Sequence, residues 1–428
     1  MAKVTIETYG CTLNQADSRI MGAILKGKGL EVEYGKIDPS NASDEGYFIV
    51  NTCTVKNPTE QKILYELAKL KPLGSRLIVA GCLASASPEK VLKAVPEASI
   101  VSTSNVHRIA EVVEAAASRN NVLLNKYSKI DKLAYGIDNN SVIAKIPISE
   151  GCLSNCTFCE TKYARGPLNS FSEEVIERAV ENAVKHGAKE IELTSQDTGA
   201  YGIDRKTNIA ELVSRVSEID GDFRIRIGML NPEHLHRYFD DLIEACKSKK
   251  VYKFLHLPVQ SGSNKVLSEM QRRYTIEEFK GYANEARNRI GASIATDIIV
   301  GYPTETAADF EDTIMLLYEV KPEVTNISKF GARPHAIASK LVQLPNNVIK
   351  ERSIRVSRIA RALQQTGRKK FIGEQKEVIV TEKNSRSFTG RDEAYNEIAI
   401  LGDNLELGKF VNVKIVGTSS ACLIGEPQ

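Results

Sequence analysis

The sequence predicts an α/β protein of three domains: an open parallel sheet, a partial parallel barrel of six strand–helix units, and a small antiparallel β-barrel. Short apolar runs alternate with helical patterns in two blocks, which a polar segment at 126–140 separates. Short β-rich runs interrupted by glycines follow near the end of the chain, as is typical of a small closed barrel. At 428 residues the chain is long enough for about three cores, since about 150 residues per domain is usual.

The first block, residues 1–125, is predicted to form the open sheet. Each apolar run is followed by a helical pattern, which is the repeating unit of a parallel sheet. Strands are expected at 4–9, 47–51 and 77–80, and helices near 15–26 and 58–70. Residues 126–140 contain few apolar side chains and are predicted to be a linker.

The central block, residues 141–345, repeats the pattern six times. Ser172 is placed to cap the helix over 172–186, and Gly187 is placed to end it. Strands are expected at 142–148, 190–194, 223–229, 252–257, 293–300 and 324–330. Six such units predict a partial barrel whose site lies at the carboxyl ends of the strands.

Residues 346–376 are predicted to form a basic helical connector to the last domain, 377–428. The segment 351–376 carries eight Lys or Arg against two Glu, whereas the whole chain has a net charge of only +3. Val356 and Ile359 lie at helical spacing between the arginines, which predicts an amphipathic helix. The basic segment is a candidate contact for a polyanion such as nucleic acid, although such runs are more often solvated helix faces.

The composition indicates a globular protein, and we expect it to be cytoplasmic with no membrane contact. The chain is 42% hydrophobic and 26% charged. Its N-terminus alternates like a strand, unlike a signal peptide, and Asp297 interrupts the best apolar run before it reaches the roughly 20 residues of a membrane helix. In a reducing compartment the eight cysteines are not a disulfide framework, so metal binding or catalysis competes with burial as their explanation.

Cys152, Cys156 and Cys159 form a C-x3-C-x2-C run just after the first strand of the central block. Thiolates are soft ligands suited to iron–sulfur clusters, and so short a loop can bind three irons of a 4Fe-4S cubane and leave the fourth iron open. A zinc site usually takes four ligands in two separated pairs, and the sequence has no evident second pair nearby. Three buried cysteines without a metal are the remaining alternative.

Cys11, Cys53 and Cys82 each follow the end of a predicted strand in the first block. Ligands gather at the carboxyl ends of the strands in open parallel sheets. Burial preference also places cysteines at strand ends, so these residues by themselves are compatible with a metal site or with packing.

The central cysteine run, with Phe158 before its last member, resembles the radical S-adenosylmethionine superfamily. The resemblance implies that S-adenosylmethionine binds the open iron through its amino and carboxylate groups. Reduction of the cluster then breaks the sulfonium bond and yields a radical that abstracts hydrogen from an unactivated carbon. The resemblance also implies an electron donor, for which we expect a flavodoxin-like or ferredoxin-like protein.

The runs that contain the three N-terminal cysteines, at 9–14, 51–56 and 80–83, are similar to the methylthiotransferases, and the similarity extends over nearly the whole chain. The similarity implies that these cysteines hold a second 4Fe-4S cluster, through whose open iron sulfur arrives. It implies conversion of a C–H bond to C–S–CH3, with a second S-adenosylmethionine supplying the methyl group. The last domain resembles the TRAM module, a small RNA-binding barrel.

The runs at 194–202, 226–232 and 257–262 most resemble the archaeal and eukaryotic branch of that family. This branch converts N6-threonylcarbamoyladenosine beside the anticodon of tRNA to its 2-methylthio derivative. Sister branches modify isopentenyl-adenosine in tRNA or an aspartate of a ribosomal protein, and both are alternatives here. A non-catalytic iron–sulfur scaffold that binds RNA is a third, which predicts no cleavage of S-adenosylmethionine under reduction.

Four polar residues at or within barrel strands are candidate contacts for S-adenosylmethionine: Ser195, Gln196, Gln260 and Asp297. Superfamily members bind the methionine amino group at the end of the second strand, often with Glu, and the amide oxygen of Gln196 can accept the same hydrogen bond without the charge. For each residue the alternative is packing in the barrel interior or in a loop.

Two arginines in the family-like run 270–274, Arg272 and Arg273, are candidate contacts for a phosphate or carboxylate of the substrate. An ordinary exposed helix end explains them equally well.

The candidate tRNA contacts are cations of the helix and of the last domain. The segment 377–428 has five Lys or Arg against eight Asp or Glu, so RNA contacts there should concentrate on its few cations. Phe388 and Tyr395 are candidates for base stacking. The predicted RNA-binding residues are Arg355, Arg358, Arg361, Lys383, Arg386 and Arg391.

Overall fold

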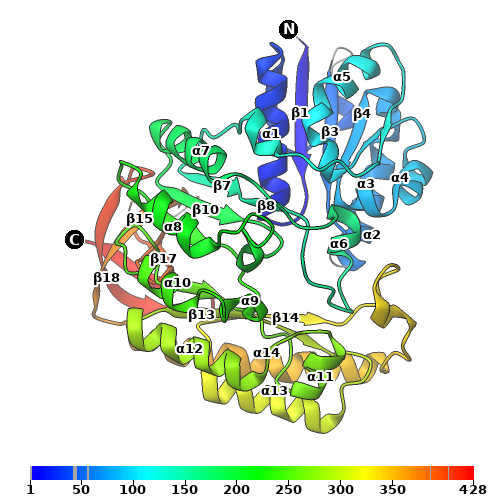
Figure 1. Ribbon diagram of the computed structural model, residues 1–428. Coiled ribbons are helices and arrows are strands. Elements are labelled where there is room, and N and C mark those ends of the chain that lie inside the picture. The colour runs from blue at the N-terminus through cyan, green and yellow to red at the C-terminus, as the bar shows by residue number, and fades with distance from the viewer. Residues whose placement is uncertain (1, 42–45, 55–56, 386, 403) are drawn as a thin grey trace.

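The computed structural model describes residues 2–41, 46–54, 57–385, 387–402 and 404–428. Over these ranges the chain forms a parallel sheet, a partial parallel barrel and a small closed barrel, in that order (Figure 1). None of the helices in the described ranges is long and apolar enough to cross a membrane.

Six parallel strands form the first sheet, in the order β2-β1-β3-β4-β5-β6. They are β1 (Lys3–Thr8), β2 (Glu31–Tyr34), β3 (Tyr47–Thr52), β4 (Leu77–Gly81), β5 (Ser99–Val101) and β6 (Leu123–Leu124). The helices are α1 (Thr12–Gly27), α2 (Asn57–Lys69), α3 (Cys82–Ala86), α4 (Pro88–Ala94) and α5 (Ile109–Ala117). Because β1 pairs with both β2 and β3, the order of strands switches direction there, and such switch points are where open sheets bind ligands.

Helix α1 belongs to the cores on both of its sides. Its Met21 and Leu25 pack in the core of the first sheet, whereas Ala16 and Ile20 pack in the core of the central barrel. A helix that is apolar on both sides is buried between two layers, as α1 is between the first sheet and β7 in Figure 1.

The central domain is built on six parallel strands in two three-stranded sheets, ordered β11-β10-β7 and β12-β13-β14. Isolated parallel β-bridges join the two sheets, so that together they form one partial barrel. The strands are β7 (Ile143–Pro147), β10 (Glu190–Thr194), β11 (Arg224–Ile227), β12 (Phe254–His256), β13 (Ser293–Val300) and β14 (Val324–Lys329). A short antiparallel pair, β8 (Ser149–Glu150) and β9 (Asn169–Ser170), follows β7.

Amphipathic helices alternate with these strands. They are α7 (Glu173–Lys185), α8 (Ile209–Glu218), α10 (Phe239–Ala245), α12 (Ile276–Ile290) and α13 (Ala307–Val320), with shorter α6 (Thr161–Arg165), α9 (Pro232–Leu235) and α11 (Asn264–Glu269). Ser172 caps α7 as predicted, since its hydroxyl accepts a hydrogen bond from the Val175 amide.

The predicted basic helix is α14 (Asn346–Lys369), and it leads into a closed barrel ordered β15-β16-β17-β19-β18. The strands are β15 (Gln375–Lys383), β16 (Phe388–Arg391), β17 (Glu397–Ile400), β18 (Phe410–Thr418) and β19 (Leu423–Pro427). Tyr395 joins this barrel to the central one, because its hydroxyl donates to Glu190 at 3.0 Å and to Glu192 at 3.2 Å. Glu190 begins β10, so the small barrel is docked at the amino ends of the parallel strands, away from the predicted mouth.

The predicted linker 126–140 packs against both flanking domains. Its Leu133 and Ile137 are buried in the central core, and Lys132 is 1% exposed. Lys132 forms ion pairs with Asp17 of the first domain and Glu150 of the second. The segment is therefore held by two buried apolar side chains and by buried ion pairs.

Candidate functional site

Cys11, Cys53 and Cys82 lie together at the carboxyl ends of β1, β3 and β4, and we call them the first thiol site. Cys11 immediately precedes α1, Cys53 follows β3, and Cys82 begins α3. The amide oxygen of Asn14 lies 3.9 Å from the Cys11 sulfur and 3.6 Å from the Cys82 sulfur. An added Cβ at Gly10 would lie 2.8 Å from the Cys53 Cβ, so the third thiol adjoins Cys11.

The first thiol site is graded from surface to interior. Cys11 is exposed, whereas Cys53 and Cys82 are buried. Burial raises the pKa of Cys82 to about 12, while the Arg165 guanidinium acts to lower this pKa and the adjacent Cys11 and Cys53 thiols act to raise it. Three thiolates gathered at one place need a bound cation to balance their charge.

Glycine before the cysteine is a shared feature of both thiol sites. Gly81 precedes Cys82 with φ of +95°, and an added Cβ would lie 2.3 Å from the Asn51 amide oxygen. Gly151 precedes Cys152 with φ of +74°, and there an added Cβ would lie 2.0 Å from the Pro167 carbonyl oxygen. Only glycine fits such a backbone and such crowding.

Cys152, Cys156 and Cys159 lie on one loop after β8, and we call them the second thiol site. All three are partly buried. The Cys152 amide donates to the Gly166 carbonyl at 3.2 Å, and the Thr157 amide donates to the Met270 carbonyl at 3.1 Å. Backbone hydrogen bonds to two different segments therefore fix the loop.

Arg272 contacts the second thiol site and is 7% exposed. Its Nη1 lies 3.6 Å from the Cys156 sulfur, and its Nη2 donates to the Pro258 carbonyl at 2.9 Å. Burial raises the pKa of Cys156, and Arg272 acts against that increase. The exposed-helix-end explanation is thus wrong for Arg272, but it suits Arg273, whose side chain is 79% exposed.

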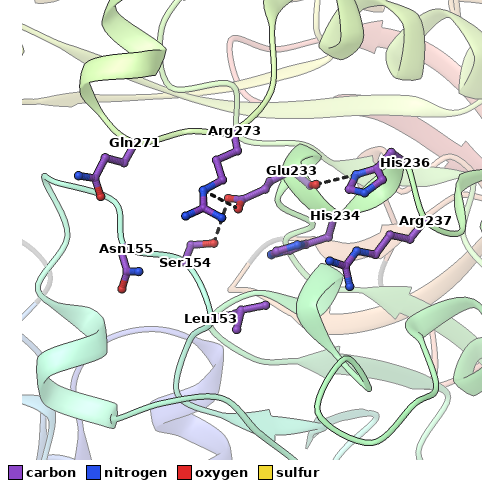
Figure 2. Close-up of a pocket in the computed structure, with 9 residues that line it drawn as sticks. All are labelled: Leu153, Ser154, Asn155, Glu233, His234, His236, Arg237, Gln271 and Arg273. Carbon is purple, nitrogen blue, oxygen red and sulfur yellow. Dashed lines mark hydrogen bonds and ion pairs between the residues drawn. The ribbon is translucent and has the colours of Figure 1, made fainter.

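A cavity of about 400 Å³ lies beside the second thiol site (Figure 2). Glu233 projects into it and accepts a hydrogen bond from the Ser154 hydroxyl at 3.2 Å, with the Arg273 guanidinium 3.9 Å away. The cavity is lined by Leu153, Ser154, Asn155, Glu233, His234, His236, Arg237, Gln271 and Arg273. Eight of these nine lining residues are polar or charged, and two of them are arginines.

The structure places the four predicted S-adenosylmethionine contacts in different surroundings. Gln196 keeps a buried amide oxygen that has no hydrogen-bond partner within the described ranges. The Ser195 hydroxyl accepts a hydrogen bond from the Asp197 backbone N–H, and the Gln260 backbone N–H donates to the Asp297 backbone carbonyl at 2.8 Å. The Asp297 carboxylate is engaged by His256 at 3.1 Å and by Asn326 at 2.8 Å.

The predicted RNA contacts differ in their exposure and in their ion pairs. Arg355, Arg358 and Arg361 are exposed along α14, and Arg355 pairs with Glu311. Lys383 is exposed, while Arg391 is partly buried and pairs with Glu397 at 3.0 Å. Arg386 lies outside the described residues.

The two proposed stacking residues are not available for that role. Phe388 is 3% exposed in the core of the small barrel, and Tyr395 packs on Tyr252 and Phe254 while its hydroxyl binds Glu190. A β-rich sequence does not reveal which aromatic side chains face the barrel core or a neighbouring domain.

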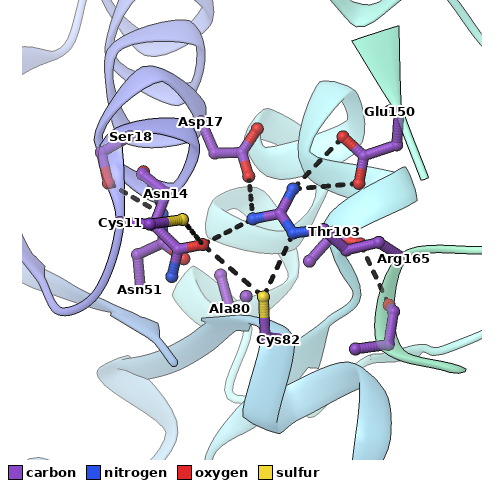
Figure 3. A network of polar contacts seen from close by, with 12 residues as sticks. Cys11, Asn14, Asp17, Ser18, Asn51, Ala80, Cys82, Thr103, Glu150 and Arg165 are labelled. Carbon is purple, nitrogen blue, oxygen red and sulfur yellow. Dashed lines mark hydrogen bonds and ion pairs between the residues drawn. The ribbon is translucent and has the colours of Figure 1, made fainter. Parts of the chain in front are cut away.

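Sequence reasoning missed Arg165, whose guanidinium contacts the first thiol site. Figure 3 shows its guanidinium between Cys82, Asn14, Asp17 and Glu150. Its position on α6, directly after the second cysteine run, gives no sign of contact with a domain about 80 residues away. Glu233 was missed for the same reason, since one sequence does not show which side chains face a site.

Both thiol sites fit the clusters that the resemblance implies. Each brings three thiols to one place, with a crowded glycine and a buried arginine beside them. Over the described ranges no three His, Cys, Asp or Glu side chains converge on a single metal ion. In a cubane each thiolate binds its own iron, so convergence on one point is not required.

Two family models match the chain: the Radical SAM superfamily over residues 146–317, and the uncharacterized protein family UPF0004 over residues 3–103. The second and first thiol sites lie in these two segments, respectively.

Solved structures share this fold at low sequence identity. A radical S-adenosylmethionine methyltransferase, TsrM, from Kitasatospora setae matches with a TM-score of 0.58 and 13% identity, over 79% of this chain and 77% of that one. The cobalamin-dependent S-adenosylmethionine radical enzyme OxsB matches with a TM-score of 0.55 over 84% of this chain and 56% of that one.

Relatives match over the full length. A probable threonylcarbamoyladenosine tRNA methylthiotransferase of Archaeoglobus fulgidus is 40% identical over 99% of this chain and 98% of its own. One of Pyrococcus abyssi is 39% identical over 100% and 99%, and the human threonylcarbamoyladenosine tRNA methylthiotransferase is 34% identical over 99% and 74%. The chain therefore belongs to the threonylcarbamoyladenosine tRNA methylthiotransferases, a family of radical S-adenosylmethionine enzymes.

Proposed function

We propose that this protein converts N6-threonylcarbamoyladenosine in tRNA to its 2-methylthio derivative, using a 4Fe-4S cluster at each thiol site. The observation that carries the proposal is the pairing of the two sites, three thiols each, within a chain that matches the family over its full length. A bound cluster with S-adenosylmethionine supplies the radical that removes hydrogen from an unactivated carbon.

The residues of the second thiol site have distinct tasks in this proposal. Cys152, Cys156 and Cys159 would hold the cluster, and Arg272 would donate to the Cys156 sulfur. Gln196 would accept a hydrogen bond from the methionine amino group through its unpartnered amide oxygen. Asp297 is less suited to that task, because His256 and Asn326 already bind its carboxylate.

The polar cavity supports the choice of substrate. The threonylcarbamoyl group carries a carboxylate and amide groups, for which the exposed guanidinium of Arg273 and that of Arg237 are suitable partners. An isopentenyl group is apolar and offers these guanidinium groups no hydrogen-bond acceptor. The cavity therefore favours the threonylcarbamoyl branch over its isopentenyl sister.

The exposed arginines of α14 are proposed to bind the tRNA backbone, and a tRNA substrate fits the cytoplasmic location expected from the sequence. Arg358 and Arg361 have no ion pair within the described part of the chain, whereas Arg355 has Glu311. Alanine at Arg358 or Arg361 should weaken tRNA binding and reduce the slope of log K against log salt by about 0.7–0.9 each. Alanine at Arg355 should have a smaller effect, because Glu311 already offsets its charge.

Nucleoside mass spectrometry of tRNA from cells with and without the protein tests the proposal. We expect 2-methylthio-N6-threonylcarbamoyladenosine to disappear without it, and to return with the wild type but not with Cys156→Ala. Loss of 2-methylthio-isopentenyl-adenosine instead would move the substrate to the sister branch. Unchanged tRNA would overturn the tRNA assignment and direct the search to a methylthio group on a ribosomal protein. The electron donor is proposed to be a small flavodoxin-like or ferredoxin-like protein.

A further inference from the structure

Arg165 lies in the radical domain but contacts the first thiol site. It is the last residue of α6 and is 1% exposed. Its Nε donates to the Cys82 sulfur at 3.2 Å, and its Nη2 donates to the Asn14 amide oxygen at 2.5 Å (Figure 3). The same Asn14 oxygen faces the Cys11 sulfur. The guanidinium therefore contacts Cys82 directly and is connected to Cys11 through the Asn14 oxygen.

Buried carboxylates fix the orientation of the guanidinium. Nη1 donates to both oxygens of Glu150 at 3.0 and 3.2 Å, and Nη2 donates to Asp17 at 2.9 Å. Lys132 pairs with the same two acids, so two cations and two anions balance. A planar guanidinium with five donors satisfies this geometry, whereas an ammonium does not.

Glu150 connects this network to the second thiol site, because it stands two residues before Cys152. One guanidinium thus contacts Cys82 of the first domain and the strand that leads into the second cysteine loop. A change in the position of either segment breaks a buried charge-assisted hydrogen bond, which is costly.

We infer that Arg165 is a positioning residue with two effects: it fixes the position of the two thiol sites relative to each other, and it raises the reduction potential of the first cluster. The inference rests on the proposed function, since it requires a cluster at the first thiol site. Hydrogen bonds to cluster sulfurs favour the reduced, more negative state. A residue of the radical domain therefore tunes the cluster of the other domain.

Two reciprocal substitutions separate this role from simple packing. Arg165→Lys keeps the charge but loses the hydrogen bond from the fixed Nε to Cys82. Lys132→Arg changes another residue of the same network, which is equally buried, and it also keeps the charge. Within the described residues, however, Lys132 contacts only oxygen atoms.

The potential is measured in a chain whose second site is removed by Cys152→Ala, Cys156→Ala and Cys159→Ala. Its anaerobically reconstituted first cluster is titrated with dithionite and followed by electron paramagnetic resonance. Arg165→Lys is expected to shift the one-electron potential to a more negative value, and Lys132→Arg is expected to leave it at the value of the parent. An unchanged potential in Arg165→Lys overturns the inference. Absence of any cluster signal with Arg165 intact overturns the first cluster itself, and with it both proposals.

The full chain supplies a second readout. Arg165→Lys should raise the ratio of 5′-deoxyadenosine to methylthiolated nucleoside, because the radical still forms while the two thiol sites are no longer held in their relative position. A parallel fall of both products, at an unchanged ratio, contradicts positioning. If Arg165→Lys does not fold, the charge-balanced pair Asp17→Asn with Arg165→Gln replaces it and is expected to give the same shifts.

Discussion

The first thiol site draws its cysteines from three strand ends, whereas the cysteines of the second site share one loop. A buried arginine contacts a sulfur atom in each, at 3.2 Å from Arg165 to Cys82 and at 3.6 Å from Arg272 to Cys156. Arg165 comes from the other domain and is paired with two carboxylates, while Arg272 donates to a backbone carbonyl. A site assembled from distant segments thus depends on an interdomain charge network, and a site built on one loop depends on hydrogen bonds to the backbone of neighbouring segments.

The largest expected effect separates the chemistry of the two sites. Cys156→Ala should abolish reductive cleavage of S-adenosylmethionine, because the second site then lacks a ligand for its cluster. Cys82→Ala should leave that cleavage but abolish the methylthiolated nucleoside. Chromatography of 5′-deoxyadenosine and of the modified nucleoside measures both. Loss of cleavage in Cys82→Ala, with the second cluster still present by its spectrum, would show that the sites do not act separately.

The two arginines should differ in what their loss costs the fold. Arg165→Leu leaves two buried carboxylates with one cation, Lys132, which is expected to cost about 3–5 kcal/mol. Arg272→Leu removes hydrogen bonds to a carbonyl and a thiol, which is expected to cost about 1–3 kcal/mol. Urea unfolding of the metal-free proteins measures the difference. Equal costs would contradict the claim that the carboxylates make the first site more dependent on its arginine.

The sequence predicted the strands of the parallel sheets where burial makes them long and apolar, as in Tyr47–Thr52 and Ser293–Val300. It missed Glu31–Tyr34 and Leu123–Leu124, which are edge strands with no fully buried residue and hence little apolar signal. It also missed Ser99–Val101, which is buried but only three residues long. It also missed Phe388–Arg391, whose pattern is too short to stand out.

The cysteines were predictable because their spacing and strand-end positions are properties of the chain itself. The charged residues around them were not, because Arg165 and Asp17 are 148 positions apart and only the fold brings them together. The same reason explains why the sequence did not decide whether Arg272 contacts substrate or belongs to an exposed helix end. In the structure it contacts Cys156. Contacts between distant polar residues have no periodicity that a single sequence reveals.

The reactivity of the thiols offers a smaller contrast between the sites. In the metal-free protein, iodoacetamide should modify the exposed Cys11 fastest and the buried Cys53 and Cys82 slowest, with a spread of about 100-fold or more. The three partly buried cysteines of the second site should react at rates closer to one another. Cys246 is a buried reference outside both sites, and burial raises its pKa to about 12. Time-resolved peptide mass spectrometry measures the rates, and a uniform rate across the first site would contradict its graded burial.

The smallest expected effect concerns the glycine that precedes a cysteine in both sites. Gly81 has φ of +95° and ψ of −163°, a region that is essentially restricted to glycine, and its Cβ would meet the Asn51 amide oxygen. Gly187 has a similar φ of +93° at the end of α7, but nothing lies within 4 Å of an added Cβ. Gly81→Ala is therefore expected to cost about 1–3 kcal/mol more than Gly187→Ala, measured by urea unfolding of the metal-free chains.

Gly151→Ala extends this test to the second site. Its added Cβ would meet the Pro167 carbonyl oxygen, so its cost should be close to that of Gly81→Ala. Equal costs would mean that the glycine before the cysteine serves both sites alike, and that the difference between them lies in the arginines. A much smaller cost for Gly151→Ala would mean that the second loop adjusts its backbone where the strand ends of the first site do not. In that case the contrast between the sites would be one of rigidity as well as of charge.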